Sequence, residues 1–183
     1  MACRVMKFVA LIVAIAGLAS PVAAQIVGDV EIVEQGIYTA DIDRTVRGPD
    51  GLFRNVLSNI CHVVETTTIP ARLGLHFGFR YRIGGVAQGR VIDVRKLTLF
   101  PTAMQPPGAT KPITRAEHTY QRQIGTIGFT GYAFDETSEL MPGIWTFQMW
   151  LGGRMLSEVK FTVIEDNGMR LPRGGGANCF KVS

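Results

Sequence analysis

The sequence has 183 residues, of which 46% are hydrophobic and 19% charged, with 19 Lys and Arg against 15 Asp and Glu. That length and composition suit one folded domain with a core of its own and argue against a disordered chain. Arg4 and Lys7 belong to a segment that we expect to be removed, which leaves 17 basic against 15 acidic residues, a net charge of +2. This weak and unclustered charge argues against a nucleic-acid partner.

Residues 1–24 have the three parts of an export signal. Two basic residues precede an apolar run over residues 8–18, and Val22-Ala23-Ala24 forms a small-residue cleavage site. The apolar run is too short to cross about 30 Å of hydrocarbon, and no later stretch is long enough. We therefore expect cleavage after Ala24, a periplasmic or secreted protein, and no membrane-spanning segment after cleavage.

The mature chain alternates between predicted strands and turns. A first strand at residues 30–41 is followed by a long connection over 43–59, in which Gly48-Pro49-Asp50-Gly51 predicts a turn. Residues 101–111 are rich in proline and predict an irregular segment. Further strands are predicted, before the hairpin described below, at residues 60–69, 73–83, 89–100 and 118–134, the last interrupted by glycines.

Two of these strands show a clear alternation of side chains. In residues 73–83 the large apolar residues all fall on one face, and that face is predicted to be core. In residues 89–100 the set Ile92, Val94 and Phe100 opposes the set Val91, Leu97 and Leu99. The core residues predicted from the whole chain are Phe77, Phe79, Tyr81, Trp145, Phe147, Val159 and Phe161.

Residues 142–163 predict a hairpin around Gly152 and Gly153. A two-residue turn would set inner residues of one strand against outer residues of the other, so a three-residue loop that includes Leu151 is expected. That register pairs Trp145 with Val159, Phe147 with Ser157 and Met149 with Met155. It leaves Trp150 on the outer face, where it would pair with Arg154 and offer a binding surface.

Two cysteines, Cys61 and Cys179, remain in the mature chain. An even pair in an oxidising compartment predicts a disulfide, with two separate thiols as the alternative. About seven strands and no helix after the export signal predict an all-β, antiparallel, two-sheet sandwich of immunoglobulin-like type, with a small β-barrel as the alternative. We assign residues 25–164 to this domain and residues 165–183 to a Gly-rich tail.

Four segments of the mature chain belong together: Val33-Glu34-Gln35-Gly36-Ile37-Tyr38, Gly131-Tyr132-Ala133-Phe134-Asp135, Glu139-Leu140-Met141-Pro142-Gly143-Ile144-Trp145-Thr146-Phe147 and Gly153-Arg154. Together they resemble an uncharacterised family of bacterial exported proteins known only as a domain of unknown function. The resemblance covers most of the mature chain. It implies the same sandwich fold, and it implies no activity and no catalytic residue.

The residues themselves predict neither catalysis nor a cofactor. There is no Gly-x-Ser-x-Gly elbow, no phosphate loop and no His-x-His pair for a metal, and Asp135, Glu136 and Glu139 suit a solvated loop better than a calcium site. We expect a non-catalytic binding or accessory module whose partner is an envelope protein or a ligand. The alternatives are a glycan or small ligand bound by exposed aromatics, or a hydrolase or protease-directed protein with a loop-built site.

One observation separates the binding prediction from the catalytic alternative. A pocket lined by two or more of five residues would favour catalysis, and their scatter would disfavour it. The five residues are His62, His76, His118, Asp135 and Glu139.

Overall fold

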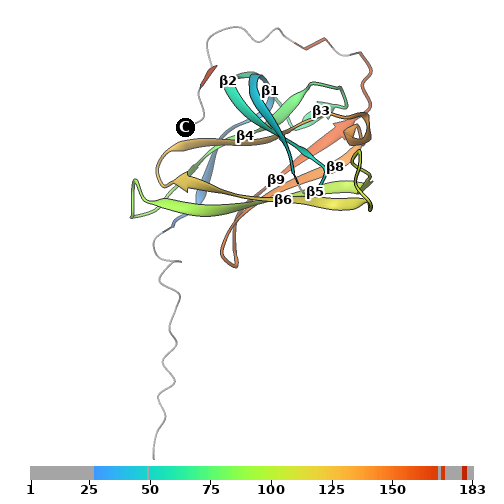
Figure 1. The fold of residues 1–183 in the computed structure, drawn as a ribbon. Coiled ribbons are helices and arrows are strands. Elements are labelled where there is room, and N and C mark those ends of the chain that lie inside the picture. The colour runs from blue at the N-terminus through green and yellow to red at the C-terminus, as the bar shows by residue number, and fades with distance from the viewer. Residues whose placement is uncertain (1–26, 49, 169, 172–178, 181–183) are drawn as a thin grey trace, which may run out of the picture.

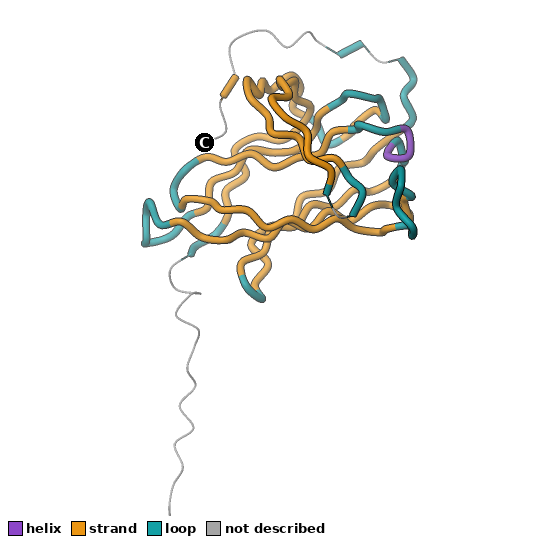
Figure 2. The backbone as a smooth tube through the Cα atoms, in the orientation of Figure 1, coloured by secondary structure: helices purple, strands orange, loops and turns teal. Residues whose placement is uncertain are grey.

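The computed structural model describes residues 27–48, 50–168, 170–171 and 179–180. In these residues the chain forms ten strands and one turn of 3-10 helix, η1 (Thr137–Glu139). The strands make two facing five-stranded sheets (Figures 1 and 2). The expected export signal lies outside the described residues. Within them, no helix is long and apolar enough to cross a membrane.

The first sheet has the strand order β10-β2-β1-β4-β7, and the second has the order β3-β9-β8-β5-β6. All pairs are antiparallel except β3 with β9, so the prediction of an all-β, two-sheet sandwich is confirmed. The strands of the first sheet are β1 (Val30–Arg47), β2 (Phe53–Glu65), β4 (His76–Ile83), β7 (Ile127–Ala133) and β10 (Cys179–Phe180). Those of the second are β3 (Thr68–Pro70), β5 (Val91–Met104), β6 (Ile113–Gln123), β8 (Gly143–Leu151) and β9 (Arg154–Ile164).

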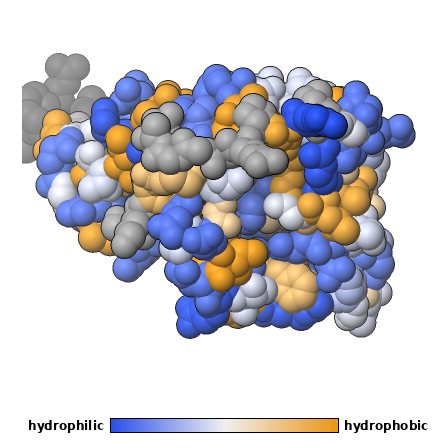
Figure 3. All heavy atoms as spheres, turned by 90° about the horizontal axis from the view of Figure 1, so that it is seen from above, coloured by the Kyte–Doolittle hydropathy of each residue, from blue (hydrophilic) through white to orange (hydrophobic). Residues whose placement is uncertain are grey.

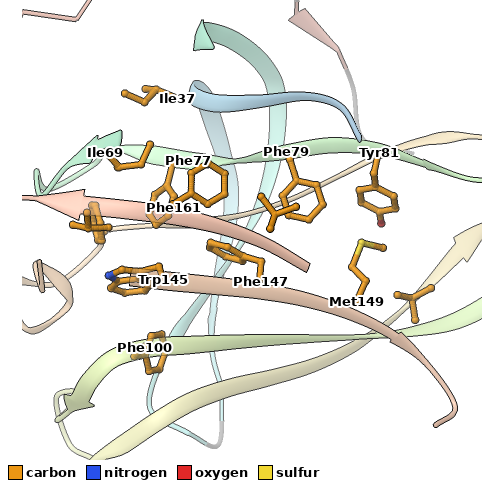
Figure 4. Packing of buried hydrophobic residues seen from close by; sticks show 14 of the residues in the cluster. Ile37, Ile69, Phe77, Phe79, Tyr81, Phe100, Trp145, Phe147, Met149 and Phe161 are labelled. Carbon is orange, nitrogen blue, oxygen red and sulfur yellow. The ribbon is translucent and has the colours of Figure 1, made fainter. Parts of the chain in front are cut away.

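The core lies between the two sheets and is mainly aromatic (Figure 4). Phe77 packs edge-on against Trp145 and Phe161, with ring centroids 5.9 and 5.4 Å apart, and against Phe147 at 5.7 Å. The seven residues that alternation assigns to the core are all at most 8% exposed. Edge-to-face pairs of this kind add about 0.5–1.5 kcal/mol each beyond the burial of their area.

The β8–β9 hairpin differs from the predicted register. Leu151 pairs with Arg154, so the turn has two residues instead of three, and Gly152 takes a positive φ of 56°. A β-bulge leaves Leu156 as an extra residue of β9, since Met149 pairs with Ser157 while Trp150 pairs with Met155. The bulge absorbs the one-residue offset that had argued against a two-residue turn.

Beyond the bulge, the pairing is shifted by two residues from the prediction. Trp145 faces Phe161 and Phe147 faces Val159, so the predicted partners Val159 and Ser157 are wrong. A shift of two residues keeps every side chain on its own face, which is why the inner face was assigned to the same residues.

A second difference concerns residues 43–59, which were predicted to be a connection. Instead β1 runs on to Arg47 and β2 begins at Phe53, so these residues form the far end of a long hairpin. We call residues 41–58 the β1–β2 arm. Register shifts between Thr39 and Asp41 and between Ile42 and Arg44 bend it away from the first sheet.

The arm crosses toward the second sheet, as Figure 1 shows for the ends of β1 and β2. At its tip, Arg47 donates a hydrogen bond of 2.6 Å to the carbonyl of Pro107, in the connection between β5 and β6. Most of the arm's β1 residues are exposed, so the alternation that marks a buried strand is missing there. The arm thus covers one end of the sandwich.

The disulfide between Cys61 and Cys179 is present, and the two cysteines are direct partners of β2 and β10. Next to it, Phe180 lies under the guanidinium of Arg80 at 4.1 Å and packs against Phe129. The bridge therefore fixes residues 179–180 to the edge of the first sheet beside β2, with the Phe180 side chain on the outer face of that sheet. That face, seen from above in Figure 3, mixes polar and apolar side chains.

Candidate functional site

A pocket of about 220 Å³ opens beside β7, the free edge of the first sheet. The inner faces of β5 and β6 form one wall, the edge of β7 with the segment after it forms a second, and the start of β2 in the β1–β2 arm forms a third. We call this space the edge pocket. It exists because the second sheet continues past β7 and the arm bends over the gap.

The wall made by β5 and β6 carries polar residues at positions that point inward. Lys96 and Thr98 continue the inner set of β5, between the buried Val94 and Phe100. In the ladder, Lys96 is the direct partner of His118. Directly paired residues on one face of a sheet have Cβ atoms about 5 Å apart, so the lysine and the histidine are neighbours in the pocket wall.

Lys96 is half-buried and has few partners. Its Nζ donates a hydrogen bond to the carbonyl of Gly131 on the edge of β7 and lies 5.3 Å from the centre of the Phe147 ring. Among the described residues, no carboxylate lies within ion-pair distance of it. Burial, and then the charge of Arg54, lower the pKa of Lys96 to about 8.

Other basic groups surround this amine. Arg54, from the arm, is held by Asp50 through two hydrogen bonds of 3.0 and 2.7 Å. His118 lies exposed at the rim, and its pKa is lowered by partial burial and by the charges of Arg54 and Lys96. Arg122 donates to Tyr81 Oη at 2.8 Å behind the pocket wall. The side of the pocket around Lys96 therefore carries basic side chains, of which Arg54 is paired with Asp50.

The wall after β7 is acidic. Both carboxylate oxygens of Asp135 accept hydrogen bonds from the side-chain amide of Asn55, at 3.2 and 3.1 Å, which ties the arm to this wall. Burial raises the pKa of Asp135. Nearby, burial lowers the pKa of His76, against the opposing effect of Asp135. The pocket thus has a basic side and an acidic side.

Glu139 lies behind the acidic wall and holds it in place. Its buried carboxylate accepts hydrogen bonds from the backbone N–H of Asp135 at 2.6 Å, from that of Glu136 at 2.9 Å and from Tyr132 Oη at 2.9 Å. Because these donors occupy its oxygens, Glu139 acts as a structural acceptor. In the described residues no cluster of His, Cys, Asp and Glu has the arrangement needed to hold a metal ion.

Three of the five residues chosen to test for catalysis converge in the edge pocket: His76, His118 and Asp135. The other two do not. Glu139 lies behind the wall, and His62 sits on the first sheet beside Tyr38, Glu34 and Glu65. The convergence satisfies the criterion that favours a catalytic site.

The lysine was missed because only histidines and carboxylates were considered. The sequence did contain an indication of it, since Lys96 falls in the same alternating set as Ile92, Val94 and Phe100.

The predicted binding surface around Trp150 and Arg154 is arranged differently from the expectation. Trp150 is half-buried, its Nε1 donates to Gln148 Oε1 at 3.0 Å, and the cation over its ring is Arg95, at 5.4 Å. Arg154 instead donates to the carbonyls of Val27 and Gly28. The predicted contact between Trp150 and Arg154 is therefore wrong, because the two-residue turn pairs Arg154 with Leu151 and Trp150 with Met155.

Comparison with known proteins gives a family and a fold. The model of a family described as domain of unknown function (DUF3859) matches residues 27–163. A solved structure of an immunoglobulin-like protein from Pseudomonas aeruginosa is similar, with 25% sequence identity and a TM-score of 0.51, over 77% of this chain and 99% of that one. No curated protein matches.

Proposed function

We propose that this chain, which belongs to the DUF3859 family, is an exported binding module that holds a small anionic ligand in its edge pocket. The role is non-catalytic, and the immunoglobulin-like sandwich acts as a rigid frame for the pocket. Such a module carries its ligand, or presents it to a partner in the cell envelope.

The observation that carries the proposal is the amine of Lys96. A half-buried ammonium without a carboxylate is costly, because the protein supplies neither full hydration nor a counter-charge. The lowered pKa of Lys96, about 8, reflects that cost. Because this pKa lies above 7, the amine is mainly charged at neutral pH, and a carboxylate or phosphate of a ligand would provide the missing partner.

A binding experiment tests the proposal. The mature protein is titrated calorimetrically at low salt with acetate, glycolate and inorganic phosphate, and the titrations are repeated with Lys96→Met and with Lys160→Met. Lys160 is a matched control, since it is exposed and paired with Glu158 at 3.0 Å. We expect Lys96→Met to weaken binding tenfold or more and Lys160→Met to leave it unchanged. Equal affinities in all three proteins would refute the anion site.

Export is part of the proposal and is supported by residues 1–24 of the sequence and by the disulfide between Cys61 and Cys179. The protein expressed in a bacterial host and recovered from the envelope fraction should begin at Gln25. Recovery of a chain that still begins at Met1 would argue against cleavage.

Catalysis is the second candidate, and the convergence of His76, His118 and Asp135 in one pocket favours it. Against it, no serine, threonine or cysteine hydroxyl or thiol in the described residues is hydrogen-bonded to either histidine. A screen of nitrophenyl esters, phosphates and glycosides separates the two candidates. Turnover that disappears in His118→Ala would favour an enzyme.

A further inference from the structure

We propose that the ligand of the edge pocket is a small anion that also bears an aldehyde or ketone, and that Lys96 holds it as a reversible imine. This inference rests on the proposed function and adds the chemical class of the ligand. It arises from the position of the amine inside the edge pocket, where a second group of the ligand can reach it.

The geometry gives Lys96 a setting that no other described lysine has. Its side chain points into a pocket of about 220 Å³ whose other walls are the arm and the edge of β7, and within the described part of the chain its one hydrogen-bond acceptor is the Gly131 carbonyl. Lys111 is exposed, and Lys160 is exposed and paired with Glu158. Burial lowers the pKa of a lysine and so favours its reaction with carbonyl compounds.

The side chains around the amine of Lys96 can bind the carboxylate of the ligand and transfer protons during imine formation. Arg54, through the N–H groups that do not bind Asp50, can hold the carboxylate of the ligand while the carbonyl carbon meets the amine of Lys96. His118 is the cross-strand partner of Lys96, with its side chain on the same face of the sheet, and can move protons between the nitrogen and the departing oxygen. Asp135 and His76 lie toward the acidic side and remain available to hydroxyl or amine groups of the ligand.

The reaction balances without an oxidant or a reductant. The neutral amine adds to the carbonyl carbon, forming a C–N bond and an alcohol. Loss of that hydroxyl together with the remaining nitrogen proton releases one water and leaves a C=N bond. Hydrolysis reverses each step, so the ligand is released unchanged.

The state of the amine supports this chemistry. The pKa of Lys96 is lowered to about 8, against an ordinary lysine value of 10.5. At pH 7.5 the neutral fraction of its amine therefore exceeds that of an ordinary lysine by a factor on the order of 100. Arg54 from the arm disfavours the proton of Lys96, and the other titratable residues that line the pocket are His76, Glu117, His118 and Asp135.

Reductive trapping tests the inference on the mature wild-type protein. Glyoxylate, which has a carboxylate and an aldehyde, is added at pH 7.5 with cyanoborohydride, and the adducts are located by mass spectrometry of peptides. Glycolate, which keeps the carboxylate and lacks the carbonyl, is the matched probe for binding alone. We expect one reduced adduct, on Lys96, formed at least tenfold faster than on Lys111 or Lys160.

Two variants accompany the wild type. Lys96→Arg keeps a cation and a donor for the Gly131 carbonyl and should form no adduct at that position, whereas Lys160→Arg should leave trapping at Lys96 unchanged. Adducts spread evenly over the lysines would overturn the inference. If glyoxylate and glycolate bind equally and Lys96 stays unmodified, the imine is wrong and the anion site stands. If acetaldehyde labels Lys96 as fast as glyoxylate does, the ligand is not an anion.

Discussion

The aromatic core and the edge pocket share the inner face of β5 but differ in what they bury. At Phe100 the strand contributes to the core, where the ring lies 5.0 Å from that of Trp145. At Lys96, four residues earlier, the same face carries a cation that no described carboxylate pairs with. The core stabilises the sandwich by removing apolar area from water, whereas the pocket places a charge where it costs stability. A group kept at such a cost is a candidate for function.

The strongest test of this comparison is the removal of the largest core side chain. Trp145 is fully buried and its Nε1 donates to the carbonyl of Met141 at 3.0 Å. Trp145→Ala should lower the free energy of unfolding by about 3–5 kcal/mol, a large part of the stability of an ordinary domain. Chemical denaturation measures it, and a loss below about 1 kcal/mol would mean that the core lies elsewhere.

The next effect concerns Glu139, which connects the two regions. Glu139→Gln replaces a carboxylate that accepts three hydrogen bonds by an amide whose NH₂ cannot accept. We expect a loss of about 1.5–3 kcal/mol of stability. Ligand binding should also weaken, since Tyr132 and Asp135 line the pocket. Denaturation and calorimetric titration of the same variant separate the two effects, and unchanged values for both would contradict the role given to Glu139.

Lys96→Met should affect binding more than stability, in contrast to the two variants above. We expect a change in the free energy of unfolding of about 1 kcal/mol or less and a large loss of anion binding. The methionine removes a costly charge, and the Gly131 carbonyl loses a donor, so the two changes offset each other. A loss of 3 kcal/mol or more in denaturation would assign the lysine to the structure of the sandwich.

The same variant gives a pH signature. Because the pKa of Lys96 is lowered to about 8 in the fold, the folded state holds this proton less tightly than the unfolded chain does. The wild type should therefore gain stability relative to Lys96→Met as the pH rises from about 8 toward the ordinary lysine value of 10.5. Anion affinity should fall over the range above pH 8, because the charged amine is lost. Parallel pH profiles of the two proteins would contradict the lowered pKa.

The smallest effect is expected at Trp150, which packs on the outer face under Arg95. Trp150→Ala should cost about 1 kcal/mol or less, in contrast to Trp145→Ala, and should leave anion binding intact. Loss of a glycan or protein partner in this variant, with normal stability, would favour the alternative of an aromatic binding surface.

Local alternation predicts the core well and the pocket poorly. In β4, β8 and β9 the apolar residues repeat at every second position, so Phe77, Trp145 and Phe161 are assigned without knowledge of their partners. The register of β8 with β9 depends on a bulge at Leu156. The pattern of residues in the two strands does not predict this bulge. The two-glycine turn alone would set inner residues of β8 against outer residues of β9, and the bulge restores the pairing of inner with inner residues.

The edge pocket could not be predicted from the sequence, because contacts between residues far apart in the chain form it. The arm reaches it by crossing from the first sheet to the second, and the bond between Asn55 and Asp135 joins residues 80 positions apart. The missed feature with a local indication was Lys96, a charged residue at an inner position of an otherwise apolar set. A charged residue at an inward position of a strand therefore indicates a candidate functional site in this family.

The most direct test of the edge pocket is the pKa of Lys96 itself. Protein carrying ¹³C-labelled lysine can be titrated by NMR, with Lys96→Arg used to assign the resonance and Lys160 as an internal reference. We expect a pKa near 8 for Lys96 in the free protein and a higher pKa when glycolate is bound, because the anion favours the charged amine. An ordinary value near 10.5, unchanged by glycolate, would show a solvated lysine and contradict the proposed anion site.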